Sequence, residues 1–340
     1  MPPIRPKRVR CPYESLTSYL RFKRSDVPAL GRVHLGAPGV GKSSIVRQIA
    51  EAKNLPLVDL RASLLDPTDL RGIPMIRNET SVWCPPAFLP KASDKPGILF
   101  LDEINAAPPL VQAALYQLIL DRRVGEYVLP DGWKIIAAGN RREDKAVTFR
   151  LSSALANRFI HLTLDVDADD WHDWAIGHGI DPCVTAFLRA RPENLSRTPD
   201  GVNPAFATPR SWEMASDVLG QFQSPQAASD ILPGILGEGV STEFLTFIKN
   251  SVILRELQSL LTRPDKAPVP KELDRLWVLV SYLTSRAADE SVQKAAAVLI
   301  NRLPADFAVV VAKDIIKCAP LFARNPAFLD FVRAHKECFL

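Results

Sequence analysis

The chain has 340 residues, 47% hydrophobic and 24% charged, a composition that excludes a disordered, collagen-like or disulfide-stapled chain. Its longest apolar runs, residues 295–300 and 307–312, are far shorter than the about 18 residues of a membrane span, so we expect none. The net charge of +4, from 42 basic and 38 acidic side chains, is too small to indicate a nucleic-acid partner. Five scattered cysteines without a CxxC pair favour a reducing compartment, and no apolar segment follows the basic residues 5–10. We therefore expect a cytoplasmic protein without a secretory signal.

The first half of the chain alternates short apolar runs with helical patterns, which is typical of a wound α/β sheet. The expected strands are residues 33–35, 57–60, 98–101, 134–138 and 160–164. Apolar residues recur at helical spacing over 109–121, which predicts a helix there. The turn triplet 130–132, Pro-Asp-Gly, stands between two strand-like runs and predicts a β-hairpin.

The second half has no strand pattern and is expected to be all helical. The predicted helices are residues 169–179, 182–190, 211–219, 242–261, 273–286, 291–303 and 307–318. A proline-rich loop at 263–270 marks a boundary within this half. At the other end of the chain, the basic residues 1–15 are expected to form a loosely attached arm, with contact to nucleic acid or an acidic partner as the alternative.

The segment GAPGVGKS, residues 36–43, matches the phosphate-binding pattern GxxxxGK[ST]. It begins where the strand 33–35 ends and opens a helix over 44–52, which is the context the pattern requires. Glycines let backbone N–H groups curl around an anion, while Lys42 supplies charge to the β and γ phosphates and Ser43 coordinates Mg²⁺. The expected nucleotide-binding residues of this loop are Gly36, Ala37, Pro38, Gly39, Val40, Gly41, Lys42, Ser43 and Ser44.

Two carboxylates end the buried strand in GILFLDEIN, residues 97–105. Successive strand residues point to opposite sides, so Asp102 and Glu103 are expected to have different roles. We expect Asp102 to hold Mg²⁺ and Glu103 to act as general base for the attacking water. Asn140 follows the strand 134–138 and can orient that water, since an amide both donates and accepts. The alternatives are two solvated acids at a strand end and a turn asparagine.

These motifs together resemble AAA+ ATPases of the MoxR family, in the helix-2-insert group. The resemblance covers residues 16 to about 219, including DPTDLRGIP at 66–74, LANRF at 155–159 and TPRSW at 208–212. It implies that Asn140 is sensor 1, that Arg158 is the arginine finger and that Arg210 is sensor 2. A guanidinium stays charged and presents a rigid fork of donors, which suits a transferring phosphoryl group. Each arginine has a surface or salt-bridged role as its alternative.

The resemblance also implies a fold and an assembly. It implies an α/β P-loop (AAA+) core with a parallel sheet, then an all-α lid and a further helical region. The expected divisions are a basic arm 1–15, a nucleotide-binding domain 16–165, a lid 166–262 and a C-terminal helical extension 263–340. ATP with Mg²⁺, a ring that is usually a hexamer, and ATP at the seam between subunits are likewise implied. Residues 71–88 correspond to the helix-2 insert, whose apolar residues either line the ring's face or pore or pack locally.

Three functions follow from these observations. The leading one is Mg²⁺-dependent ATP hydrolysis that remodels or activates a client protein, including maturation or metal-cofactor insertion, because MoxR-like proteins commonly act with a partner bearing a von Willebrand factor A domain. A nucleic-acid-associated motor is the alternative that relatives of the insert group suggest, but the near-neutral charge disfavours it. A nucleotide-switched scaffold that barely hydrolyses ATP is disfavoured by the presence of Glu103 and Asn140.

Overall fold

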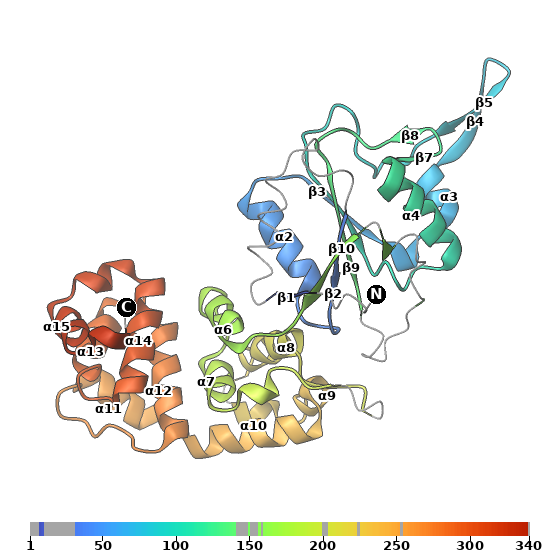
Figure 1. Cartoon of the computed structure of the whole chain (residues 1–340). Coiled ribbons are helices and arrows are strands. Elements are labelled where there is room, and N and C mark those ends of the chain that lie inside the picture. Colours follow the sequence, from blue (N-terminus) through green and yellow to red (C-terminus); the bar gives the residue numbers. More distant parts are fainter. Residues whose placement is uncertain are drawn as a thin grey trace, which may run out of the picture. The chain divides into compact units, whose positions relative to one another are not determined.

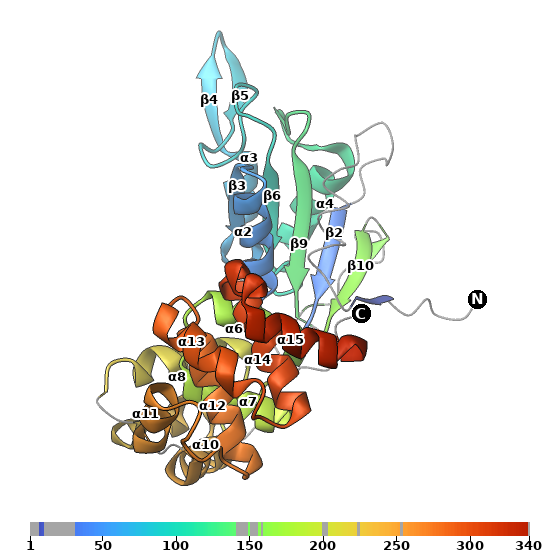
Figure 2. The same ribbon diagram turned by 90° about the vertical axis from the view of Figure 1, so that its left-hand side faces the viewer.

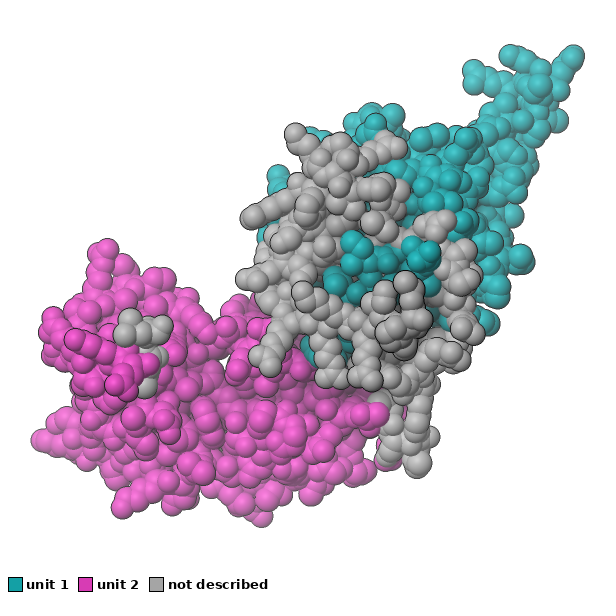
Figure 3. All heavy atoms as spheres, viewed as in Figure 1, with its two compact units in different colours: residues 1–165 teal, residues 166–340 magenta. Residues whose placement is uncertain are grey.

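In a computed structural model of the chain, the described residues are 7–9, 31–140, 149, 156–157, 159–198, 203–222, 225–251 and 254–338. They belong to two compact units, Met1–Asp165 and Val166–Leu340, which Figure 3 colours separately. Within the described part, no helix combines the length and the apolar composition that a bilayer crossing needs.

The first unit is built on a parallel sheet with the strand order β1-β10-β2-β9-β6-β3 in the described part of the chain (Figures 1 and 2). Its strands are β1 (Lys7–Val9), β2 (Gly31–Leu35), β3 (Leu57–Arg61), β6 (Ile98–Asp102), β9 (Lys134–Gly139) and β10 (Phe159–Leu164). The five strands predicted from apolar runs are all present. For Lys7–Val9, the prediction of a loosely attached arm is wrong, because these residues pair with β10.

Helices pack on both faces of this sheet, and the alternation of strand side chains explains how. Helix α2 (Lys42–Ala52) shares a buried cluster with Ile98 and Phe100 of β6. Helix α4 (Pro109–Asp121) shares another with Leu99 and Leu101 of the same strand. Because successive side chains point to opposite faces, one continuous apolar run serves both clusters. The central strand β6 is thereby packed on both of its faces.

Two antiparallel hairpins are added to the first unit. Short elements precede the first one: η1 (Ala62–Leu64) and α3 (Pro67–Arg71), the latter with a capping box formed by Asp66 and Asp69. The first hairpin pairs β4 (Ile73–Arg77) with β5 (Thr80–Cys84) and extends away from the sheet (Figure 1). Its two turn residues, Asn78 and Glu79, both have positive φ, as a type I′ turn requires.

The second hairpin corrects a prediction. It pairs β7 (Arg123–Val124) with β8 (Tyr127–Val128), and its turn is at Gly125 and Glu126. The predicted hairpin with its turn at 130–132 is wrong, since β9, which follows that triplet, pairs in parallel with β2 and β6. The triplet instead precedes β9 of the large sheet. The strand before the triplet, β8, has only two residues, so its sequence does not show that it pairs with β7.

The second unit is helical in its described part, as predicted. Its helices are α6 (Ala168–Gly177), α7 (Pro182–Ala190), α8 (Pro209–Leu219), α9 (Pro233–Leu236), α10 (Glu238–Ser251), α11 (Leu254–Thr262), α12 (Leu273–Ser285), α13 (Glu290–Leu299), α14 (Ala305–Cys318) and α15 (Pro326–Ala334), with 3-10 turns η3 (Pro192–Asn194), η4 (Pro225–Ala228), η5 (Pro320–Arg324) and η6 (Lys336–Cys338). Where one helix was predicted over 242–261, α10 and α11 are found. Proline occupies the first turn of α7, α8, α9 and α15, where its missing N–H costs nothing.

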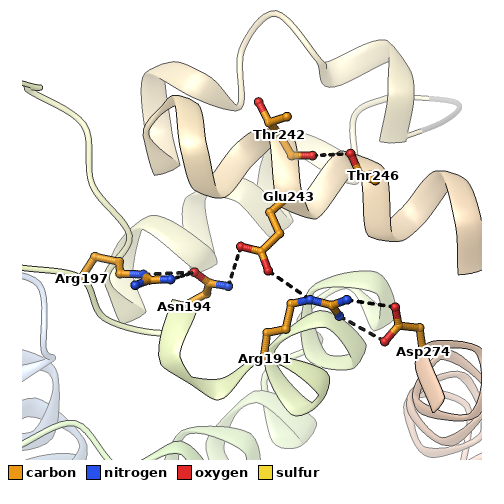
Figure 4. A network of polar contacts seen from close by, with 7 residues as sticks. All are labelled: Arg191, Asn194, Arg197, Thr242, Glu243, Thr246 and Asp274. Atoms are coloured by element: carbon orange, nitrogen blue, oxygen red, sulfur yellow. Dashed lines mark hydrogen bonds and ion pairs between the residues drawn. The ribbon is translucent and has the colours of Figure 1, made fainter.

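A single buried cluster runs through the second unit, from Trp171 to Phe331. Helix α12 contacts both α7 and α14, so residues on either side of position 262 share this core. A polar network also crosses that position: Arg191 pairs with Asp274 through two hydrogen bonds of 3.1 and 3.0 Å and with Glu243 at 3.0 Å (Figure 4). Figure 4 shows Glu243 also accepting from Asn194, which joins α10 to the turn after α7.

A buried ion pair provides a test of this shared core. Arg189 of α7 and Asp314 of α14 lie 2.5 Å apart, with side chains only 11% and 6% exposed. We expect Asp314→Ala to lower the free energy of unfolding by about 3–5 kcal/mol, because it leaves a buried guanidinium without its partner. Lys317→Ala is the control: it breaks an exposed pair with Asp173 in the same unit and should cost less than about 1 kcal/mol. Urea denaturation of the whole chain measures both, and equal losses would contradict the account.

Candidate nucleotide-binding site

The loop of residues 36–41 joins β2 to α2 and has the backbone of a phosphate-binding loop. Gly39 and Gly41 have φ of 78° and 88°, a region of backbone conformation that residues with a Cβ rarely adopt. Gly36 lies against the end of β10, where a Cβ would come within 2.9 Å of the Leu164 carbonyl oxygen. The sequence therefore needs glycine at these positions, and the loop ends directly at the N-terminus of α2, where partial positive charge favours an anion.

Lys42 joins this loop to the end of strand β9. Its Nζ donates to the carbonyl oxygens of Gly36 at 2.8 Å and Ala37 at 2.9 Å, and to Oδ1 of Asn140 at 2.9 Å. Asn140 directly follows β9, the strand beside β2, which explains how a residue 98 positions away reaches the loop. The predicted phosphate-binding lysine and the predicted water-orienting asparagine thus lie in direct contact.

The two predicted carboxylates have different partners. Asp102, the last residue of β6, accepts through Oδ2 from the Ser43 hydroxyl at 2.6 Å. Glu103 leaves the strand with φ of 55°, a conformation that is unfavourable for a residue with a side chain and that recurs at functional sites. Its Oε2 accepts from the Ser63 hydroxyl at 2.5 Å. The expectation that neighbouring strand residues face different ways agrees with these contacts.

Two residues of this site were missed in the sequence. Ser63 lies in η1, directly after β3, and reaches Glu103 because β3 is the sheet neighbour of β6. Asn105 is 5% exposed, and its carboxamide makes two hydrogen bonds with the backbone of Asn140. Neither residue belongs to the phosphate-loop pattern, and only the strand order reveals their partners. A serine following an edge strand carries no sequence signal of its own.

Of the remaining predicted residues, two lie in the described part of the chain and one does not. Ser44 is exposed on the first turn of α2, beside Ser43. Arg210 is exposed at the second position of α8 in the second unit, whose first turn has a capping box between Thr208 and Ser211. Arg158 lies outside the described residues, immediately before β10 begins at Phe159. The roles of the two arginines therefore stay predictions.

The donor set of the site fits Mg²⁺ bound with a nucleotide. Mg²⁺ takes hard oxygen ligands and in P-loop proteins draws on only one or two side chains, with phosphate oxygens and water completing its shell. The Ser43 hydroxyl and the Asp102 carboxylate are such a pair, already in contact at the mouth of the loop. The Lys42 ammonium donates to the carbonyl oxygens of Gly36 and Ala37 at the start of the phosphate loop. A phosphate bound by the N–H groups of this loop would therefore lie beside the ammonium group.

Comparison with known proteins agrees with this geometry. Residues 33–159 match the family profile of the AAA domain, dynein-related subfamily. Midasin of Giardia intestinalis is 31% identical over 151 residues, which are 42% of this chain and 3% of midasin. "Putative chaperone BssE" of Thauera aromatica is 31% identical over 145 residues, 40% of this chain and 50% of BssE. The chain thus spans at most about half the length of these two relatives.

Solved structures with detectable similarity include two further proteins. A point mutant of Thermotoga maritima RuvB has a TM-score of 0.42 and 19% identity, over 79% of this chain and 80% of that one. NtrX of Brucella abortus in complex with ATP has a TM-score of 0.34 and 16% identity, over 99% and 70%. The family match and the loop geometry together identify residues 33–159 as an AAA+ ATPase domain of the P-loop class. The fold class expected from the sequence is confirmed.

Proposed function

We propose that this protein is a Mg²⁺-dependent ATPase that assembles into a ring, usually a hexamer in related proteins, and remodels or activates a client protein. The observation that carries the ATPase part is the meeting of Lys42, Ser43, Asp102 and Asn140 in one hydrogen-bonded site. The client part rests on the similarity to BssE, on the resemblance to MoxR proteins and on the exposed hairpin discussed below. Maturation and metal-cofactor insertion are the kinds of activation we have in mind.

In this proposal each residue of the site has a defined task. The backbone of residues 36–43 and the Lys42 ammonium bind the β and γ phosphates. Ser43 and Asp102 would hold Mg²⁺, which when bound neutralises charge on those phosphates. Glu103 accepts the proton of the attacking water, and the Asn140 amide orients that water without adding charge. These steps need only groups that lie at or follow the carboxyl ends of the neighbouring strands β2, β6 and β9.

Two arginines supply the remaining groups, one of them from the neighbouring subunit. We propose that Arg158 acts on the nucleotide of the neighbouring subunit and that Arg210 reaches the phosphates of its own subunit when the helical part closes. Both guanidiniums stay charged at any working pH and suit the charge that develops during phosphoryl transfer. Their assignment rests on LANRF and TPRSW. Hydrolysis would then depend on assembly, so that an isolated subunit would not consume ATP at the full rate.

The β4–β5 hairpin is our candidate for the surface that contacts the client. Ile73, Met75 and Ile76 are 73%, 54% and 86% exposed, which disfavours local packing for these three residues, whereas Trp83 of the same insert packs locally against Arg71. Exposed apolar side chains on a projecting two-stranded ribbon are typical of protein interaction sites. The net charge of only +4, from 42 basic and 38 acidic side chains in the whole sequence, does not favour nucleic acid as the partner.

We propose that the partner carries a von Willebrand factor A domain and that the protein works in the cytoplasm. The partner class rests on the MoxR resemblance alone. The location is supported by Cys84, Cys183 and Cys318, which are free thiols in the described part of the chain, as a reducing compartment requires. ATP rather than GTP likewise follows from the family.

Client capture tests the proposal. Glu103→Gln should retain ATP and hold its client, so the client should co-purify with this variant in the presence of ATP and not with Lys42→Ala. Adding Ile76→Asp should abolish capture while leaving basal hydrolysis of the otherwise wild-type chain unchanged. Leu110→Asp is the matched control, because Leu110 is 74% exposed in the same unit but lies on α4. Capture that survives Ile76→Asp, or that is lost equally in the control, would refute the role of the hairpin.

A further inference from the structure

Asn105 connects the loop that follows β6 to the residue that follows β9. Its Nδ2 donates to the carbonyl oxygen of Asn140 at 2.5 Å, and its Oδ1 accepts from the backbone N–H of Asn140 at 3.1 Å. One carboxamide therefore satisfies both polar groups of a single backbone residue, as a neighbouring strand would. Beside it, the Ile104 N–H donates to the carbonyl of Ala138 in β9 at 2.9 Å, so the loop after β6 is bonded both to β9 and to the residue that follows it.

The fit around this amide is close. Gly139, the last residue of β9, has no side chain, and a Cβ built there would lie 2.6 Å from Oδ1 and 3.0 Å from Cγ of Asn105. The backbone carbonyl of Asn105 also accepts from the N–H of Phe149 at 2.6 Å. Asn105 is 5% exposed and directs its side-chain hydrogen bonds to Asn140. The absence of a side chain at Gly139 thus leaves room for the Asn105 amide, which lies against the end of β9.

Asn140, whose backbone Asn105 binds, is also the residue whose side chain contacts Lys42 of the phosphate loop. Asn140 Oδ1 accepts from Lys42 Nζ, and Lys42 in turn donates to Gly36 and Ala37. Asn105 follows Glu103 by two residues, and the Ala106 N–H donates to the Glu103 carbonyl in the same turn. The Asn105 side chain therefore links the turn that carries the proposed general base to the backbone of the proposed water-orienting residue, beside the Ile104–Ala138 backbone bond.

We propose that Asn105 is a positioning residue for ATP hydrolysis, which fixes the Asn140 backbone so that its side-chain amide stays aligned with Lys42 and with the turn of Glu103. This inference rests on the proposed ATPase function. Both side-chain hydrogen bonds of Asn105 go to the Asn140 backbone, so it acts through Asn140. A misplacement of about 1 Å in such a group can cost about 100-fold in rate, while the phosphate loop itself stays intact.

The test uses one variant that keeps the shape of the amide and two that remove or displace it. Asn105→Asp replaces the Nδ2 donor with an oxygen facing the Asn140 carbonyl, and Asn105→Ala removes both bonds. We expect kcat to fall by about 10- to 100-fold in each, with the Kd for ATP changed by less than about threefold. Gly139→Ala approaches from the other side and should give the same split, because its Cβ displaces the Asn105 amide. Gln112→Glu is the matched control.

The control and a double-variant comparison separate positioning from mere stability. Gln112 is also a 5% exposed amide of this unit and donates to the Ala107 carbonyl at 3.1 Å, away from Asn140, so its variant should keep a near-normal kcat at a similar melting temperature. Asn105→Ala added to Asn140→Ala should slow turnover no further than Asn140→Ala alone. Multiplicative losses, a kcat loss equal to that of Gln112→Glu, or lost ATP binding would each overturn the inference.

The same assays distinguish failure of the positioning role of Asn105, here called the clamp, from failure of the ATPase proposal. If the wild type binds ATP but shows no turnover under any condition, the ATPase function is refuted, and the clamp with it. If the wild type hydrolyses ATP and Asn105→Asp does so equally fast, only the clamp is refuted.

Discussion

Lys42→Ala should abolish nucleotide binding, whereas Glu103→Gln should bind ATP normally and hydrolyse it about 100-fold or more slowly. The lysine supplies the charge that holds the β and γ phosphates, and its removal also breaks its contacts with the phosphate loop and with Asn140. The glutamine keeps the size of Glu103 and a side-chain oxygen that can still accept from Ser63, but it no longer accepts a proton from water. Binding is measured by titration calorimetry and turnover by phosphate release.

A conservative control sharpens this comparison. Lys53 lies at the end of α2, away from the phosphate loop, so Lys53→Ala should change neither binding nor turnover. Equal loss of ATP binding in Lys42→Ala and Glu103→Gln would refute the role given to Glu103, because a general base is not needed to hold the nucleotide. Normal turnover in Glu103→Gln would refute it equally.

Arg158→Ala should bind ATP normally and turn over up to about 1,000-fold more slowly, by analogy with other arginine fingers. The proposal places its guanidinium at the neighbour's nucleotide, so the variant's own phosphate loop lacks nothing. Lys42→Ala fails for a different reason, because it lacks the phosphate-binding lysine. Mixing the two variants should therefore restore ATP hydrolysis at those subunit interfaces that combine an intact phosphate loop with an intact Arg158. Subunit exchange is first verified with labelled protein, and wild-type subunits diluted with each variant serve as the reference.

Recovery on mixing is the result that a finger acting between subunits requires. Lack of recovery between exchanging subunits would contradict it. Loss of ATP binding in Arg158→Ala would instead indicate that the side chain supports its own subunit's site.

The sequence was most informative where one physical cause decides the structure. The apolar run of β6 is buried on both faces, so its pattern alone predicts a central strand, and the glycines at 39 and 41 are required by their positive φ. Helix α4 has the bounds predicted from its apolar spacing, residues 109–121. The contact between Lys42 and Asn140 also follows from parallel strands ending at one edge of the sheet.

It was least informative where partners are set by strand order. Residues 73–84 have no strand alternation that a core would impose, because the hairpin is exposed, and they were assigned only by resemblance. The strand Lys7–Val9 depends on an edge offered by β10. Asn105 and Ser63 owe their importance to hydrogen bonds with residues 35 and 40 positions away, and no local pattern encodes such bonds.

ATP turnover at physiological salt, with the captured client, single-stranded DNA, duplex DNA and RNA added in turn, tests the central claim most directly. A remodeller of proteins should be stimulated several-fold by its client alone, and with few basic groups in excess the chain should show no steeply salt-dependent stimulation by nucleic acid. The basic residues Arg5, Lys7, Arg8 and Arg10 are changed to glutamine in parallel rather than deleted, since deletion would remove β1. Stimulation by DNA or RNA that survives this change would contradict the account and favour a nucleic-acid motor.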